Sequence, residues 1–235
     1  MEVLGLSVAA GLATVAGAAL LFGRRSWNER NLAFFLGLAA GVMAAVVALN
    51  MMPSALLLYP VGPGLAGLAL GLVLMGYYGR FARLEGGGGD TPLMRLGLLI
   101  MLGIALHDLP EGMAIALGEE LKGRTGLVIA LGVGVHNIPE GMVMAAPLLM
   151  AGMPRRQILG RCLLVALITP LGALLGAALL GVAPGIMPVM LGLASGIMAW
   201  LCLFQLWPQA VKRDGGRSRW GFLAGVAIII LATFL

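Results

Sequence analysis

Long apolar segments alternate with short polar connections along the whole chain. A helix that crosses a bilayer needs about 20 mostly apolar residues, and it satisfies its own backbone hydrogen bonds. The chain has eight segments of that kind, at residues 3–22, 32–51, 56–78, 94–117, 125–150, 157–181, 184–207 and 219–235. This pattern predicts an all-α integral membrane protein with eight transmembrane helices, folded as a single transmembrane domain over residues 1–235.

The composition indicates that lipid is the solvent for most of this chain. Of the 235 residues, 60% are hydrophobic and 11% are charged, and the mean hydropathy is +1.03. Soluble domains carry about 25% charged residues, so a soluble fold of this size could not bury so much apolar surface. A net charge of +5 would suggest a nucleic-acid partner in a soluble protein. Here we assign the basic residues to short loops, and expect the lipid bilayer and no nucleic acid as partner.

The basic residues also predict the orientation. All Lys and Arg residues except Lys122 and Arg124 lie in or beside the loops that follow the first, third, fifth and seventh segments. Cytoplasmic loops carry an excess of Lys and Arg, so we place these loops in the cytoplasm and both termini outside it. The third loop, a linker at about residues 80–93, contains Gly86 to Gly89. We expect a multi-pass protein of the cytoplasmic (inner) membrane.

Two internal repeats connect segments that cross the membrane in opposite directions. Residues 36–55 match residues 191–210 at nine of twenty positions, which relates the second and seventh segments. Residues 102–117 match residues 131–146 at eight of sixteen positions, which relates the fourth and fifth. Chance similarity between Gly/Ala/Leu-rich helices is the alternative. Inverted repeats are typical of transporters, whose site lies at the repeat interface near the middle of the membrane.

The fourth and fifth segments carry the candidate chemistry. The two histidines, His107 and His136, each open the pattern H-x-x-P-E-G, and Glu111 and Glu140 follow them by four residues. Residues four apart share one face of a helix, so each segment offers an imidazole and a carboxylate from one stripe. An acid within a membrane is costly and is a functional candidate by default. A structural role and a proton relay without metal are the alternatives.

Imidazole and carboxylate together suit zinc, iron, manganese or cobalt. Zinc accepts four ligands, which the two histidines and two glutamates could supply, and Asp108 and Asn137 offer further oxygens. Pro110 and Pro139 lack a backbone N–H, so two carbonyls near the acids should lose their helical partner. The sequence therefore predicts a site for a divalent metal ion between the fourth and fifth segments. For the fifteen methionines, a core-filling role is favoured over a place in a metal pathway.

At these residues the chain resembles the ZIP (Zrt/Irt-like protein) family of divalent metal-ion transporters, of the bacterial type. The resemblance covers nearly the full length, and the motif HNIPEG at residues 136–141 is highly specific. It implies an inverted 3+2+3 helix arrangement, often dimeric, in which a transport unit moves against a scaffold. It implies uptake of zinc or a related divalent ion into the cytoplasm. It also carries the family's metal ligands onto His107, Asp108, Glu111, His136, Asn137 and Glu140.

The chain departs from the family at several polar positions. Asp108 replaces the Asn that commonly follows the first histidine, and Thr169 stands where many relatives have Glu. Amides and a serine replace acids that are common on the second and seventh helices. We therefore predict that a second metal site is weak or absent. The candidate pathway residues are Asn50, Ser54, Thr169, Gln205, Gln209, Met113 and Met142.

Two other functions stay open on the residues alone. An intramembrane metal-dependent hydrolase is disfavoured because the pattern is H-x-x-x-E rather than H-E-x-x-H, without an obvious extra acid as general base. A non-transporting membrane metal sensor is consistent with the uncharged second and seventh segments. We expect a transporter and not an enzyme, moving a divalent ion by alternating access. Zinc is the first choice of substrate, with iron, manganese, cobalt and cadmium as alternatives.

Overall fold

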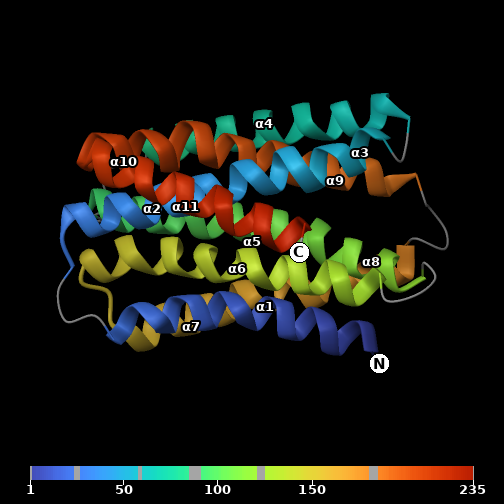
Figure 1. Ribbon diagram of the computed structural model, residues 1–235, viewed down its shortest axis with the longest axis horizontal. Coiled ribbons are helices and arrows are strands. Elements are labelled where there is room, and N and C mark those ends of the chain that lie inside the picture. The colour runs from blue at the N-terminus through green and yellow to red at the C-terminus, as the bar shows by residue number, and fades with distance from the viewer. Residues whose placement is uncertain are drawn as a thin grey trace.

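The computed structural model describes residues 2–23, 27–57, 60–84, 91–120, 125–179 and 185–234, and the elements assigned there are helices (Figure 1). In chain order they are α1 (Glu2–Leu20), η1 (Leu21–Gly23), α2 (Glu29–Val46), η2 (Val47–Met51), α3 (Met52–Leu57), α4 (Val61–Leu84), α5 (Pro92–Glu120), α6 (Thr125–Met150), α7 (Arg155–Ala166), α8 (Ile168–Leu179), α9 (Ile186–Leu201), η3 (Cys202–Leu206), α10 (Trp207–Arg213) and α11 (Gly215–Phe234). Here η1 is a short 3₁₀ turn, and η2 and η3 are π-helical turns.

Eight helical stretches of the described chain are long and apolar enough to span a membrane, which confirms the predicted class. The fifth span covers the predicted residues 125–150. The second and seventh run on to Leu57 and Arg213, because α3 and α10 follow the π-helical turns η2 and η3 without a break and extend these spans past the predicted ends. The predicted linker at 80–93 is partly helical, because α4 continues to Leu84 and α5 begins at Pro92. Residues 85–90 of this linker lie outside the described chain. The predicted span residues 58–59, 180–181, 184 and 235 also lie outside it.

Side-chain caps explain where several helices begin. The Asn28 side chain accepts a hydrogen bond from the Asn31 amide at the start of α2. Thr91 Oγ1 accepts from the Met94 amide at the start of α5, and Asp214 accepts from the Arg217 amide at the start of α11. Amide groups in the first turn of a helix have no partner within the helix, so these caps fix the ends of the spans.

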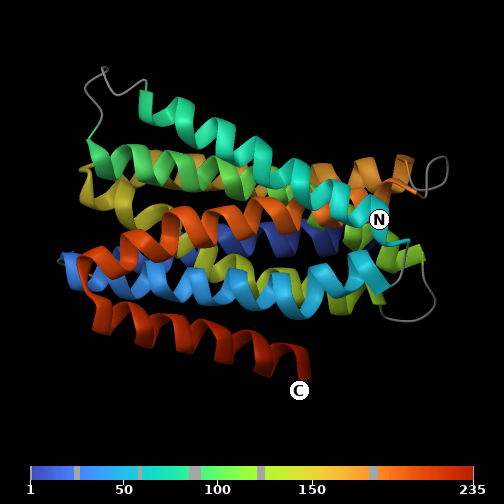
Figure 2. The ribbon, with the colours of Figure 1, turned by 90° about the horizontal axis from the view of Figure 1, so that it is seen from above.

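The spans form pairs around a central α5 and α6 (Figures 1 and 2). α2 packs on α11, and a Cβ at Gly37 would collide with the carbonyl of Ser218. α4 packs on α9, and a Cβ at Gly192 would collide with the carbonyl of Gly64. On the other side, α6 packs on α1 and α5 packs on α8. Small residues let these backbones approach closely, which places α5 and α6 between two groups of helices.

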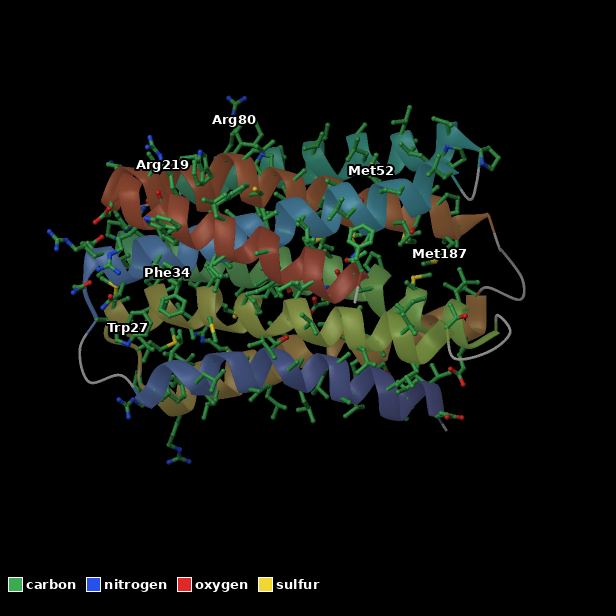
Figure 3. The ribbon with its side chains drawn as sticks, viewed as in Figure 1. Trp27, Phe34, Met52, Arg80, Met187 and Arg219 are labelled. Atoms are coloured by element: carbon green, nitrogen blue, oxygen red, sulfur yellow. The ribbon has the colours of Figure 1, made fainter. Side chains whose placement is uncertain are left out.

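The two ends of the bundle differ in charge. Arg80 and Arg219 lie at the end where α4 finishes and α11 begins (Figure 3). Met52 and Met187 lie toward the opposite end, where α1 begins and α9 starts. We call the end with Arg80 and Arg219 the arginine-bearing end, and its place on the cytoplasmic side stays a prediction.

Candidate metal centre

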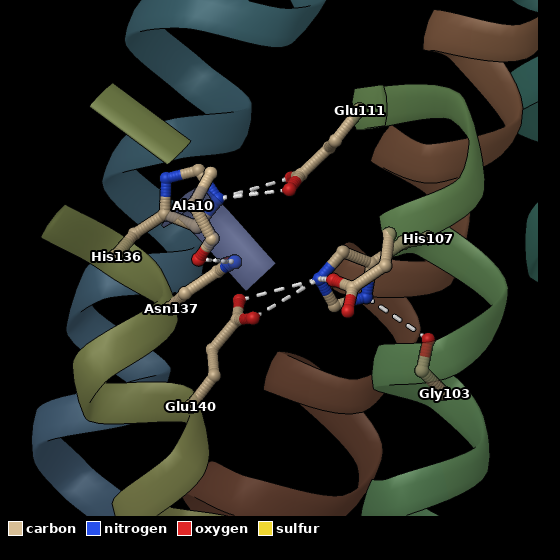
Figure 4. Close-up of polar contacts among 8 residues, drawn as sticks. Ala10, Gly103, His107, Glu111, His136, Asn137 and Glu140 are labelled. Atoms are coloured by element: carbon tan, nitrogen blue, oxygen red, sulfur yellow. Dashed lines mark hydrogen bonds and ion pairs between the residues drawn. The ribbon is translucent and has the colours of Figure 1, made fainter. Parts of the chain in front are cut away.

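The predicted histidines and glutamates meet between α5 and α6, and each imidazole pairs with the carboxylate of the other helix (Figure 4). His107 Nε2 of α5 lies 3.3 Å from both carboxylate oxygens of Glu140 on α6. His136 Nε2 of α6 lies 3.1 Å from both carboxylate oxygens of Glu111 on α5. The structure therefore brings these four side chains together and pairs them across the two helices.

The direction of the two helices explains this pairing. α5 starts at the arginine-bearing end and α6 starts at the opposite end, so the helices run antiparallel. His107 and Glu140 are the members of their motifs nearer to the arginine-bearing end, and they face each other. Glu111 and His136 are the pair nearer to the other end. Four residues of helix rise about 6 Å, so the two pairs are stacked along the bundle. The prolines do not interrupt these helices, and α5 and α6 remain helical through Pro110 and Pro139.

Two glycines one residue after the glutamates allow the neighbouring helices to approach the site. A Cβ at Gly112 would collide with the backbone carbonyl of Thr169 on α8. A Cβ at Gly141 would collide with the backbone carbonyl of Thr14 on α1. Glycine at these positions therefore sets how α1 and α8 close the site from outside.

The site is almost fully enclosed. His107, Asp108, Asn137 and Glu140 are 0% exposed, and Glu111 is 1% exposed. His136 is the most accessible of the six predicted ligands at 5%. An imidazole or carboxylate buried to this degree needs a partner, and a bound cation would supply one.

A backbone contact orients the first imidazole. His107 Nδ1 lies 2.9 Å from the carbonyl oxygen of Gly103, one turn earlier on α5. A proton on Nδ1 that is donated to this carbonyl leaves Nε2 as the nitrogen facing Glu140. Metal-binding histidines commonly donate their other ring nitrogen in this way, which fixes the tautomer and the ring orientation.

Asp108 and Asn137 occupy matching places beside the two pairs but differ in their contacts. Asn137 Nδ2 donates a 3.0 Å hydrogen bond to the carbonyl of Ala10 on α1. Within the described chain, both Asp108 oxygens lack a hydrogen-bond partner, and the nearest imidazole nitrogen, His107 Nε2, is 3.6 Å away. One ligand atom from each of His107, Asp108 and Glu111 can be chosen so that all lie within 4.8 Å of one another. These three residues are the group of the described chain best placed to share an ion.

A cavity of about 390 Å³ reaches this site from the end where α1 begins. Glu111 and His136 lie in its lining, whereas His107, Asp108 and Glu140 do not. The predicted pathway residues Asn50 and Ser54 line its wall. The cavity therefore extends from that end of the bundle to the Glu111–His136 pair.

The other predicted pathway residues are spread over the molecule. Gln205 and Gln209 line a second cavity toward the arginine-bearing end. Thr169 is fully buried, and its hydroxyl has no partner within the described chain. Met113 packs in a small apolar cluster with Ala55, Met187 and Leu191, and Met142 packs against the main core. The core-filling interpretation fits both methionines.

Sequence reasoning missed several residues of the site. Thr233 of α11 lines the cavity, and its Oγ1 donates a 3.4 Å hydrogen bond to the side-chain oxygen of Asn50. The carbonyls of Gly103 and Ala10 hold His107 and Asn137. A backbone carbonyl carries no signal in the residue type, and Thr233 lies far along the chain in an apolar segment, so only the packing of the helices identifies them.

Comparisons with known proteins agree with this site. A family model described as ZIP Zinc transporter matches residues 87–233. The chain is 34% identical to the zinc transporter ZupT of Chlorobium luteolum, over 98% of this chain and 96% of that protein. It is 33% identical to zinc transporter ZupT of Corynebacterium glutamicum, covering 98% and 97%, and 31% identical to that of Escherichia fergusonii, covering 97% and 94%. With this match over nearly its whole length, the chain belongs to the ZIP family.

Proposed function

We propose that this protein takes up a divalent transition-metal ion, with zinc as the first choice, through the centre between α5 and α6. The observation that carries the proposal is the pair of cross-helix contacts, His107–Glu140 and His136–Glu111, buried in the membrane region and reached by a cavity. The relatives named zinc transporters support zinc. Iron, manganese, cobalt and cadmium remain predictions, since imidazole and carboxylate also suit them.

In this proposal the ion meets the two pairs in sequence. It enters the open cavity and first contacts Glu111 and His136, which line it. It then reaches the pair of His107 and Glu140, with Asp108 as an additional oxygen ligand and Asn137 held by α1 as a neutral neighbour. An imidazole nitrogen and a carboxylate about 3 Å apart hold a proton between them, so the arriving ion displaces these protons. Reprotonation on the opposite side would then favour release of the ion.

We further propose that α5 and α6 lie within an inverted 3+2+3 repeat. Three pairs of matching features support this. The π-helical turns η2 and η3 occur at matching positions of the sequence repeat. Gly37 and Gly192 match in the repeat and make matching contacts with α11 and α4. Gly112 and Gly141 match and contact Thr169 and Thr14. Alternating access would come from movement of α5 and α6 against α2 and α9, exchanging the open cavity for one at the other end.

The orientation and location belong to the same proposal. The arginine-bearing end would face the cytoplasm, with both termini and the open cavity outside. The protein would reside in the inner membrane as one transmembrane domain. A homodimer stays a prediction of the family resemblance.

Family membership decides between the transporter and the hydrolase, two of the functions that the sequence analysis considered. ZIP proteins are transporters, so the hydrolase interpretation is not retained. A non-transporting sensor would bind metal without flux, and a flux measurement separates it from a transporter.

Uptake of ⁶⁵Zn into proteoliposomes tests the proposal. We expect saturable uptake by the unmodified chain and uptake reduced at least about tenfold in Glu111→Gln, because one carboxylate ligand is lost. Glu2→Gln is the matched control, since Glu2 is exposed and does not line the cavity. Equal uptake by both variants would remove Glu111 from the site. Tight binding without uptake by the unmodified chain would favour the sensor.

A further inference from the structure

A second cavity, of about 430 Å³, lies toward the arginine-bearing end between α4, α5 and the helix formed by η3 and α10. Its lining contains Arg95, Gln205 and Gln209, together with Gly79, Pro92, Leu96, Leu99 and Phe204. None of these lining residues carries a carboxylate, an imidazole or a thiol. The ligand chemistry that suits the metal centre is therefore missing from this wall, and a guanidinium repels cations.

Two polar side chains of this cavity lack partners in the described part of the molecule. Arg95 Nε is buried and has no hydrogen-bond partner there. Gln205 is 6% exposed, and no hydrogen bond holds its carboxamide to any residue that the structure describes. Gln209 is already held, because Arg213 Nη1 donates to both its backbone and side-chain oxygens. That contact leaves the Gln209 amide nitrogen as a donor with no partner among the residues that the structure describes. Unsatisfied donors that converge on a cavity are favourable for a ligand with several acceptor oxygens.

We propose that this cavity binds the phosphate group of an anionic ligand, with Arg95 as its charged anchor and Gln205 and Gln209 as neutral donors. The guanidinium offers parallel N–H groups that match two oxygens of a phosphate. This site is separate from the metal centre and does not depend on the proposed transport function.

The depth of the cavity indicates where the phosphate comes from. The apolar stretch of α4 ends at Arg80, one residue after Gly79, and Arg95 lies in the first turn of α5. The charged end of the cavity is therefore level with the boundary of the span. On the apolar side of the cavity, Phe204 is 55% exposed. A phospholipid headgroup lies at this level, and basic pockets between membrane helices on the cytoplasmic side bind anionic headgroups. Dissolved phosphate offers the same chemistry from the aqueous side.

Native mass spectrometry of the full-length protein in detergent tests the site, with phosphatidylglycerol and phosphatidylcholine as probes. We expect phosphatidylglycerol to bind about tenfold or more tightly to the unmodified chain than to Arg95→Gln. Arg80→Gln is the matched control, because it removes the same charge from an exposed position at the same end. Phosphatidylcholine should not distinguish the three proteins. Gln205→Leu, which keeps the charge and the approximate volume, should also weaken binding and serves if Arg95→Gln fails to fold.

Titration with inorganic phosphate separates the two sources. If phosphatidylglycerol shows the Arg95 dependence and inorganic phosphate does not compete, the ligand is a lipid headgroup. If inorganic phosphate binds with the same Arg95 dependence, a dissolved phosphate supplies the ligand and the site still stands. The proposal is overturned if the unmodified chain, Arg95→Gln and Arg80→Gln all bind phosphatidylglycerol equally and all bind inorganic phosphate equally. Loss of zinc transport alone has no bearing on these readings, since no metal is needed.

Discussion

Replacing Asp108 by asparagine should make the metal-free protein more stable, although it changes a residue of the proposed metal centre. Asp108 is fully buried, and neither of its oxygens has a hydrogen-bond partner in the described chain. The 3.6 Å distance to His107 Nε2 is too long for a hydrogen bond. A buried polar group without a partner costs about 1–3 kcal/mol. Removing that cost is the source of the expected gain.

The matching position on α6 shows what an asparagine would find. On α6, Asn137 lies four residues before Gly141, which contacts Thr14 of α1. The Asn137 side chain donates to the carbonyl of Ala10, which lies four residues before Thr14 on α1. Asp108 lies four residues before Gly112, which contacts Thr169 on α8. By the same geometry, an amide at position 108 would face the carbonyl four residues before Thr169, that of Val165. A carboxylate oxygen cannot donate to a carbonyl, whereas an amide can.

We therefore expect Asp108→Asn to raise the free energy of unfolding by about 1–3 kcal/mol in the presence of a chelator. For a chain of this size, each kcal/mol should raise the midpoint of thermal unfolding by about 2–4 °C. Thermal unfolding in detergent, followed by intrinsic fluorescence, measures the shift. Asn137→Asp is the control, and it should lower the midpoint because it loses the bond to Ala10.

Zinc should stabilise the unmodified chain more than Asp108→Asn. A ligand that binds only the folded state stabilises it according to its affinity. If Asp108 is a ligand, zinc will raise the midpoint of the unmodified chain more than that of Asp108→Asn. An Asp108→Asn protein no more stable than the unmodified chain without metal would refute the argument from the missing partners. An equal effect of zinc on both would remove Asp108 from the ligand set.

Three further outcomes follow from the packing and the two cavities. Gly112→Ala should lower the free energy of unfolding by about 1–3 kcal/mol, because the added Cβ meets backbone atoms. Gly132→Ala is the control in thermal unfolding and should be nearly neutral, because no described neighbouring atom lies within 4 Å of its Cβ. Zinc binding should release about two protons per ion, measured with a pH indicator in weak buffer, and Glu111→Gln should release fewer. Zinc binding without acidification would contradict the proposal that each histidine–glutamate pair holds a proton. Ser54→Cys should react with an impermeant maleimide from outside and Gln209→Cys from the cytoplasmic side, and labelling of both from one side would refute the proposed orientation.

Much of the fold could be predicted from the sequence because lipid imposes a simple rule. A segment in hydrocarbon must satisfy its own backbone, so length and hydropathy are enough to find the spans. The predicted ends of the second and seventh spans were several residues short because polar residues beyond them, such as Ser54 and Gln209, reduce the apolar signal. These residues belong to helices that continue through π-helical turns, and the polar side chains face cavities instead of ending the span.

The histidines and glutamates that meet between α5 and α6 could be predicted, but their arrangement required the packing. Histidine and glutamate are rare within apolar segments, so the two motifs identify their own members. The enclosure of the site depends on residues without such a signal. Gly112 and Gly141 admit the neighbouring helices, and the carbonyls of Gly103 and Ala10 orient His107 and Asn137. Glycine and alanine are common throughout this chain, so their residue type alone cannot indicate these roles.

The cross-helix pairing follows from two facts that the sequence supplies separately. The spacing of four places a histidine and a glutamate on one face of each helix, and this alone suggests pairing within a helix. Adjacent spans run antiparallel, which reverses one motif relative to the other. When two identical motifs face each other in reverse, each histidine lies opposite the other helix's glutamate, as His107 and Glu140 do. A shift of one helical turn along α6 would instead bring like groups together. The close contacts at Gly112 and Gly141 fix this register from outside, so the pairing depends on α1 and α8 as much as on the motifs themselves.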